Sequence, residues 1–326
     1  MKINIKQKDQ CSLITAATHM GQKKPGTELA GDWLKVRGLS EKISEFFSDF
    51  RDIGNVFESI KHEKEYELSD ELSITKKLKK LSHYSERLSE VIFRELSQDR
   101  FVLTIGGDHS IAAGTLAASL QFDENIKVLW VDAHADLNTP RTSPSHNTHG
   151  MPVAIAMDLV NEVSENNLFS FLPKLKPQNI AYIGLRDVDP GERAFLDRFN
   201  IKSYDAQDVH RLGIEQVLTE CKQYLDPDST NNIHLSFDVD AIDPLYFPAT
   251  GTPVPEGLSL KDGRRIIEFL NSETNLISFD LVEINPLLGG KEELDQTFAS
   301  TMELLSALKR TRKYPTGSIH LEENSV

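Results

Sequence analysis

Six short apolar runs recur along this chain, and polar or acidic residues gather at the C-terminal end of almost every one. The runs cover residues 12–18, 101–110, 126–136, 179–187, 233–243 and 276–286. Near-continuous stretches of Val, Ile and Leu are typical of strands that are buried on both faces, as in a parallel sheet. Helix-like segments lie between them at 111–121, 191–199, 213–225 and 260–271. This alternation predicts a three-layer α/β/α fold around a central, mainly parallel β-sheet.

The length of 326 residues and the absence of a dividing linker predict a single domain over residues 1–326. Residues 55–98 differ from the rest because they are highly charged, with apolar residues at helical spacing. That pattern predicts one or two amphipathic surface helices. We expect the tail at 314–326 to be flexible.

Charge and composition limit the binding partners and the cellular location that we expect for this protein. The chain has 36 Lys and Arg against 50 Asp and Glu, a formal charge of −14, which disfavours binding to nucleic acid. It contains no run of 18 apolar residues, so no membrane span is expected. The N-terminus lacks the pattern of a secretory signal, and two cysteines are too few for a disulfide framework. These features predict a cytoplasmic protein.

Four aspartates and two histidines stand at the ends of three apolar runs. Side chains alternate along a strand, so residues two apart point the same way. Ligands of open α/β sheets bind beyond the carboxyl ends of the strands. We therefore expect six side chains to meet at one edge of the sheet: His109, Asp132, His134, Asp136, Asp238 and Asp240.

Four crowded aspartates would be driven toward protonation unless cations lay between them. Two divalent ions would balance their formal charge, and carboxylate and imidazole ligands without thiolate favour Mn²⁺ over a structural zinc site. Two metals roughly 3.5–4 Å apart can share one water and lower its pKa, giving hydroxide near neutral pH. Each motif alone is more often a strand end or a turn, but three at successive strand ends are hard to explain by structure only.

Seven motifs occur in the order typical of the ureohydrolase superfamily, and the chain resembles its arginase family in particular. They are GGDHS, VDAHADLNTP, SHNTHG, YIGLRDVDPGE, SFDVDAIDP, GTPVPEGLS and EINP, with a fainter trace in GQKKPGTELAG near the N-terminus. The resemblance implies two Mn²⁺ per subunit, held by the six residues named above. It also implies hydrolysis of L-arginine to L-ornithine and urea, by attack of a metal-bridging hydroxide on the guanidinium carbon.

The resemblance further assigns roles around the metals. Asp136 would be both a ligand and part of the catalytic group. Glu283 would hold the guanidinium fork, and His149 would transfer protons. Without the motifs, Glu283 would be read as a sheet-end acid in a surface pair and His149 as a polar loop residue.

Recognition of the α-groups of arginine is implied for the loop after the metal motif and for RDVDPGE. Asn138, Ser145 and Asn147 correspond to the carboxylate side, and Asp189 and, through water, Glu192 to the amino side. Thr252 would support the metal site. Groups left unpaired by agmatine should make the pocket reject it. The two acids could instead cap the helix that follows them.

The chain departs from the family pattern at several places. His146 stands where the family usually has Gly, which can take a positive φ at low cost. Arg141 adds a charge near the mouth without an assigned role, and the 55–98 region looks enlarged. Family members are often trimers or hexamers, so a homo-oligomer is implied. Two alternatives remain open: a ureohydrolase acting on agmatine or another guanidino or formimino compound, and a catalytically silent regulatory homologue.

Overall fold

Eight parallel strands form one sheet in the computed structural model, which describes residues 9–59, 73–160 and 167–309. The strands lie in the order β2-β1-β3-β8-β7-β4-β5-β6, and every neighbouring pair is parallel. Their bounds are β1 (Gln10–Ala16), β2 (Asp49–Asn55), β3 (Phe101–Gly106), β4 (Lys127–Val131), β5 (Ile180–Leu185), β6 (Lys202–Asp205), β7 (Asn232–Asp238) and β8 (Asn275–Val282).

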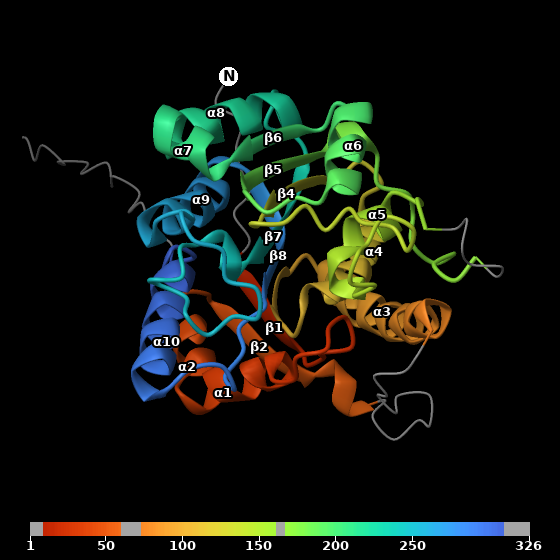
Figure 1. Cartoon of the computed structure of the whole chain (residues 1–326). Helices are drawn as coiled ribbons and strands as arrows, with labels where there is room; N and C mark the ends of the chain where they lie inside the picture. Colours follow the sequence, from red (N-terminus) through yellow and green to blue (C-terminus); the bar gives the residue numbers. More distant parts are fainter. Residues whose placement is uncertain (1–8, 60–72, 161–166, 310–326) are drawn as a thin grey trace, which may run out of the picture.

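Helices cover both faces of the sheet (Figure 1). One layer consists of α3 (Ile74–Leu96), α4 (Ala112–Phe122), α5 (Pro152–Ala156) and α6 (Pro190–Arg198). The other consists of α1 (Ala30–Val36), α2 (Leu39–Ser44), α7 (Ala206–Leu212), α8 (Ile214–Leu225), α9 (Leu260–Glu273) and α10 (Lys291–Ser306). The predicted three-layer α/β/α fold is therefore confirmed.

The central strands are apolar on both faces because each face supports its own core. In β4, Leu129 and Val131 join the core on the side of α8 and α9, whereas Val128 and Trp130 join the core on the side of α4. This alternation explains why the strand reads as a continuous apolar run. Burial of both faces removes the polar positions that would otherwise mark a period of two.

The sequence prediction missed both strands at the edges of the sheet. β2 is half-buried or exposed along its whole length, and β6 has only four residues, Lys202–Asp205. An edge strand of this kind has no need of a continuous apolar run. By contrast, the four expected helices occur as α4, α6, α8 and α9, within about two residues of the expected bounds.

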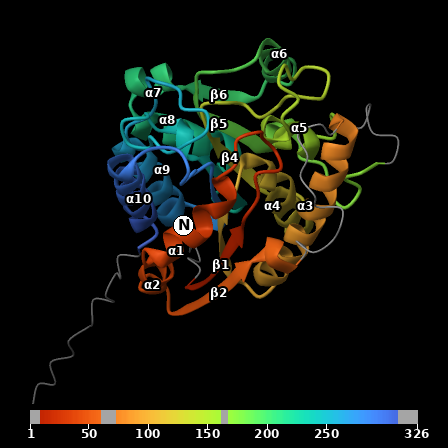
Figure 2. The ribbon, with the colours of Figure 1, turned by 60° about the horizontal axis from the view of Figure 1, so that its bottom comes forward.

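The charged region at 55–98 contains one amphipathic helix within the described residues. This helix, α3, buries Leu78, Leu81, Tyr84 and Leu88 in the core that it shares with α4. Figure 2 shows α3 alongside α4 on the outside of the molecule. Residues 60–72 of the predicted region and the tail at 314–326 lie outside the described residues. No helix in the described parts of the chain is both long and apolar enough to cross a bilayer.

The chain order changes direction in the middle of the sheet. After β3 the chain passes through α4 to β4, and β8 and β7 later fill the space between these two strands. Such a switch point is where open α/β sheets bind ligands, beyond the carboxyl ends of the strands. The carboxyl ends of β3, β8, β7 and β4 therefore lie side by side at the place where the polar motifs fall.

At the opposite, N-terminal edge a buried guanidinium joins three strands. Arg100 is fully buried; its Nε donates to Ser12 Oγ at 2.7 Å, and its Nη1 donates to Asp49 Oδ2 at 2.6 Å. Ser12 Oγ in turn donates to Glu95 Oε2 at 2.7 Å. The hydrogen bonds tie the starts of β1, β2 and β3 to the end of α3.

We predict that Arg100→Ala lowers the free energy of unfolding by about 3–5 kcal/mol, because it removes a fully buried guanidinium that bonds Ser12 and Asp49 and lies 3.7 Å from the buried Glu95 carboxylate. The matched control is Arg51→Ala, since Arg51 Nη1 lies 3.7 Å from the same carboxylate but its side chain is 45% exposed. That change should cost less than about 1 kcal/mol. Urea denaturation of both variants measures the difference, and equal losses would contradict the buried role.

Candidate metal centre

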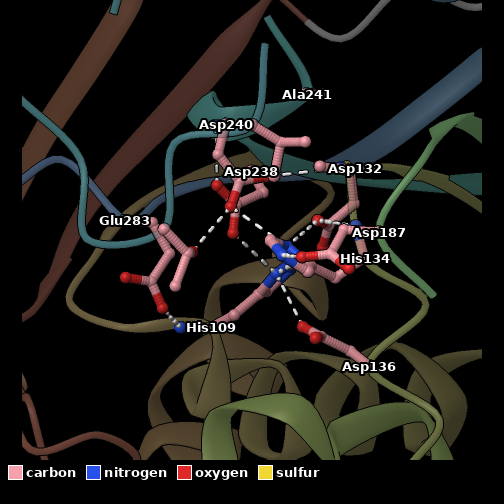
Figure 3. A network of polar contacts seen from close by, with 12 residues as sticks. His109, Asp132, His134, Asp136, Asp187, Asp238, Asp240, Ala241 and Glu283 are labelled. Atoms are coloured by element: carbon pink, nitrogen blue, oxygen red, sulfur yellow. Dashed lines mark hydrogen bonds and ion pairs between the residues drawn. The ribbon is translucent and has the colours of Figure 1, made fainter. Parts of the chain in front are cut away.

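Six candidate ligands lie at the carboxyl ends of three central strands. His109 opens a 3-10 turn, η4 (His109–Ile111), three residues after β3 ends. The turn is capped by Asp108, whose Oδ1 accepts from Ser110 N at 3.0 Å. Asp238 is the last residue of β7, and Asp240 lies in the next 3-10 turn, η8 (Val239–Ala241). Figure 3 shows these side chains and those of the segment after β4 pointing toward one another.

The first group of ligand atoms surrounds His109. Its Nδ1 lies 3.0 Å from Asp132 Oδ2, 3.0 Å from Asp136 Oδ2 and 3.3 Å from Asp238 Oδ2. The His109, Asp132 and Asp238 atoms are close enough together to hold one metal ion. This is the convergence that the sequence predicted.

The second group surrounds His134. Its Nδ1 lies 3.4 Å from Asp132 Oδ1 and 3.1 Å from Asp240 Oδ2, and these three residues could also hold an ion. Asp132 is common to both groups and offers a different oxygen to each. A carboxylate used in this way can bridge two cations.

The hydrogen bonds around the two groups fit metal ligation. His109 Nδ1 is buried and has no hydrogen-bond partner among the described residues, although three carboxylates lie near it. The other ring nitrogen, Nε2, lies 2.9 Å from Ser236 Oγ. If Nε2 carries the proton and donates to Ser236, Nδ1 presents its lone pair to a metal. Trp130 Nε1 donates to Asp132 Oδ2 at 2.9 Å, and Thr252 Oγ1 donates to Asp240 Oδ2 at 2.9 Å.

The electrostatics of the site favour bound cations. Burial raises the pKa of Asp136 to about 6, and the charge of Asp132 adds to the rise. Burial and the charges of Asp240 and Asp132 raise the pKa of Asp238 well above its usual range. Burial acts on Asp132 in the same direction, but the close imidazoles of His109 and His134 outweigh it and hold the pKa of Asp132 low. Carboxylates packed this closely need protons or metal ions between them.

This convergence was predicted from the alternation of side chains along a strand, and that explanation was wrong. Alternation along a strand cannot align Asp132, His134 and Asp136, because β4 ends at Val131 and the three residues follow it without regular structure. Asp136 has a φ of 48°, in the left-handed region that residues other than glycine adopt rarely. A turned backbone, rather than a pleated strand, directs these side chains inward.

His149 and Glu283 lie beside the first group. Glu283 is 1% exposed, and its Oε1 accepts from His109 N at 2.9 Å and lies 3.0 Å from His149 Nδ1. Burial alone would raise the pKa of Glu283, but the hydrogen bond with His149 outweighs it and lowers the pKa. Burial alone would lower the pKa of His149, but the same bond and the nearby carboxylates raise it to about 9.

A cavity opens beside the two groups and includes most of the residues expected to contact substrate. Asn138, Ser145, Asp189, Glu192 and Thr252 line it together with the metal-group residues His134, Asp136 and Asp238. His149 also lines it, whereas Asn147 and Glu283 are not among its lining residues. Asp187, whose Oδ2 lies 3.7 Å from His134 Nε2, adds a further acid to the rim.

The two acids of RDVDPGE also serve the helix that follows. Asp189 is the N-cap residue of α6, and its backbone N donates to Glu192 Oε2 at 2.9 Å. Glu192 Oε1 accepts from Leu137 N at 3.0 Å, which ties the helix to the loop after β4. Asn138 Nδ2 donates to Asp189 Oδ2 at 2.8 Å. The capping alternative is therefore confirmed, because both Glu192 oxygens accept hydrogen bonds from backbone N atoms. Both side chains also line the cavity.

The departures from the family pattern fall on the outer part of this loop. His146 has a φ of 53°, so it adopts the backbone conformation for which glycine is suited. Ser143 Oγ accepts from His146 N at 3.0 Å and helps to hold the turn. Arg141 is exposed, and its backbone N donates to Thr139 Oγ1 at 3.3 Å.

Several residues that shape the site were not predicted. Ser236 and Trp130 each hold a candidate ligand, and Asp108 and Gln22 lie around Glu283 and His149. Gln22, Asp108 and Ser236 lie within the motifs GQKKPGTELAG, GGDHS and SFDVDAIDP, but no role was predicted for them from the sequence. Trp130 lies outside the motifs and is a core residue whose partner depends on the fold.

We predict that Asp132→Ala lowers the content of bound divalent metal more than Asp240→Ala, because Asp132 belongs to both ligand groups and Asp240 to one. Elemental mass spectrometry after dialysis measures the ions retained per chain. Asp187→Ala is the matched control, since Asp187 is a neighbouring acid on the rim that belongs to neither group. Equal metal content in the Asp132→Ala and Asp187→Ala variants would contradict the shared-ligand geometry.

Comparisons with known proteins identify the family of the chain. The family described as "Arginase family" matches residues 9–308. Hepatic arginase of Aquarana catesbeiana is 38% identical over 296 residues, 90% of this chain and 90% of the relative. Bacillus subtilis arginase is 34% identical, over 91% of this chain and 98% of the relative. A solved structure of Entamoeba histolytica arginase in complex with L-ornithine is 31% identical with a TM-score of 0.81, covering 93% of this chain and 99% of that one. The chain therefore belongs to the arginase family of hydrolases.

Proposed function

We propose that this protein hydrolyses L-arginine to L-ornithine and urea with two bound Mn²⁺ ions. The observation that carries the proposal is the pair of ligand groups that share Asp132, placed next to the His149–Glu283 pair and a cavity lined with acids. The curated relatives are called arginases, and one related structure holds L-ornithine. Both facts support arginine as the substrate.

The chain's own residues would hold the ions. His109, Asp132, Asp136 and Asp238 would bind one, and Asp132, His134 and Asp240 the other. When bound, the pair supplies the positive charge that lowers the pKa of a water and makes it a nucleophile near neutral pH. The nitrogen and oxygen ligands without thiolate suit Mn²⁺.

The organic part of the substrate would be held by side chains around the cavity. Glu283, kept ionised, can accept hydrogen bonds from the guanidinium and hold its carbon in position for attack. Asp189 and Glu192 would face the α-amino group, with Asn138, Ser145 and Asn147 on the carboxylate side. The acids at this rim favour a ligand with a cationic amino group.

His149 would move protons during the reaction. It lies at the cavity wall, and its side chain is 18% exposed, so the imidazole has contact with both Glu283 and solvent. Departure of ornithine requires a proton on its leaving nitrogen, and an imidazole can deliver it. The pKa of about 9 keeps a proton available on this group.

Other expectations from the sequence belong to the same proposal. We propose one catalytic domain over residues 1–326, a homo-oligomer such as a trimer or hexamer, and a cytoplasmic location without nucleic-acid or membrane partners. The main rival is a ureohydrolase that acts on agmatine or another guanidino or formimino compound. A silent regulatory homologue is disfavoured because both ligand groups and the His149–Glu283 pair are present.

We predict that the manganese-loaded protein releases urea from L-arginine and little from agmatine. Agmatine keeps the amino group but lacks the α-carboxylate, so the amide and hydroxyl groups on the carboxylate side of the pocket would be left without partners. Parallel urea assays with the two substrates at equal concentration measure this preference. Urea release from agmatine alone would replace the proposed substrate, and no release from either would favour the silent homologue.

We predict that His149→Asn lowers kcat for arginine by roughly 10²–10⁴-fold, the range of general acid–base catalysis, while metal content stays unchanged. His149 belongs to neither ligand group, so metal retention should not depend on it. Steady-state kinetics and metal analysis on one preparation check both parts. Full turnover in the variant would remove the proton-transfer role.

A further inference from the structure

The segment between β1 and the short turn η1 (Thr27–Leu29), residues 17–26, lies against the candidate active site. Its Gly21 N donates to Asp108 Oδ2 at 2.7 Å, and its Gly21 O accepts from His149 N at 3.1 Å. Figure 2 shows this red segment passing toward α5, which follows His149 in the chain. We call residues 17–26 the N-terminal loop.

The loop is attached along its whole length. Lys24 Nζ donates to the backbone oxygen of Gly251, and Asn285 Nδ2 donates to Pro25 O at 3.0 Å. A Cβ atom at Gly21 would lie 2.6 Å from Asp108 Oδ1 and 2.8 Å from His149 N, so only glycine fits there. The close packing places the next residue, Gln22, next to the Glu283 carboxylate.

Among the residues that the structure describes, Gln22 makes the one hydrogen bond to the second oxygen of this carboxylate. Its Nε2 donates to Glu283 Oε2 at 2.7 Å, whereas His109 N and His149 Nδ1 both contact Oε1. An ionised carboxylate only accepts hydrogen bonds, so the amide must present its nitrogen. The contact links residues 261 positions apart in the chain.

The number of hydrogen bonds that the Glu283 carboxylate can accept indicates what the contact with Gln22 does. A carboxylate offers about four such positions, and three already have protein donors. A guanidinium fork that bonds both oxygens needs one position on each. His149 must then release Oε1, because that oxygen already has two donors. Gln22 and the backbone of His109 remain to hold the carboxylate while the fork binds.

We propose that Gln22 is a positioning residue that orients Glu283 for the guanidinium group, and that the N-terminal loop is the back wall of the guanidinium subsite. The inference rests on the proposed function, since it concerns how the same site recognises arginine. Gln22 does not touch the reacting atoms in this arrangement. It acts through Glu283, so its effect should be confined to ligands that use this carboxylate.

The test compares ligands with and without a guanidinium group. In Gln22→Ala, kcat/KM for arginine should fall by about 10- to 100-fold, the effect of one hydrogen bond to a charged group. The inhibition constant of L-norvaline, which has the α-groups but no side-chain nitrogen, should stay within about twofold, because it needs no contact with Glu283. Gln22→Glu keeps the shape but places two carboxylates together, so its loss for arginine should be larger.

The matched control is Lys23→Ala, an exposed neighbour in the same loop, which should leave all values unchanged. Melting temperature and metal content identify variants that lose structure. An unchanged kcat/KM in both Gln22 variants would overturn the proposal, and so would equal losses for arginine and norvaline, which would mean that the loop only supports the fold.

Calorimetric titration with guanidinium chloride separates this proposal from the proposed function. A wild-type protein that releases no urea would overturn the arginine assignment. The contact with Gln22 would still predict weaker guanidinium binding in Gln22→Ala than in wild type. Equal guanidinium affinity in the two proteins would overturn the role of Gln22 whatever the substrate.

Discussion

Repulsion among buried aspartates is the constraint on which the rest of the site depends. Asp132, Asp136, Asp238 and Asp240 are all at most 6% exposed, and they come from the ends of only two strands. Packing of carboxylates in this way is unfavourable unless positive charge enters. Parallel strands bring such residues together because all their carboxyl ends lie at one edge. The fold therefore creates an electrostatic problem that bound cations would solve, and the proposed chemistry would use the same cations.

The sequence predicted the parts of the fold whose pattern reflects burial. The runs that became β3, β4, β7 and β8 are buried almost throughout and mostly apolar, because both of their faces lie in a core. β2 and β6 lie at the edges of the sheet and carry polar residues, so nothing distinguished them from loops. Strand order could not be predicted, because the pattern of one strand says nothing of its neighbour.

The site was predictable to the extent that its residues lie in local motifs. His109, Asp132 and Asp238 each belong to a short motif at a strand end, and three such ends must meet if the sheet is parallel. Gln22 lies in the faint GQKKPGTELAG trace, but its role could not be predicted because it depends on a contact with Glu283 across 261 positions of the chain. The inward direction of Asp136 was attributed to the wrong cause, since the turn after β4 depends on backbone angles that alternation does not describe.

Two carboxylate residues of the site have positive φ values, and neighbouring hydrogen bonds hold both of them in place. Asp136 and Glu283 have φ values of 48° and 66°, where glycine would cost less, but glycine has no carboxylate to offer. Such conformations cost about 1–3 kcal/mol each and persist only where neighbours fix them. Val153 N donates to Asp136 O at 3.0 Å, and Glu283 N donates to Gly107 O at 3.0 Å. The backbone thus holds each carboxylate at an angle that its own residue disfavours, which is the arrangement expected where function rather than folding selects the side chain.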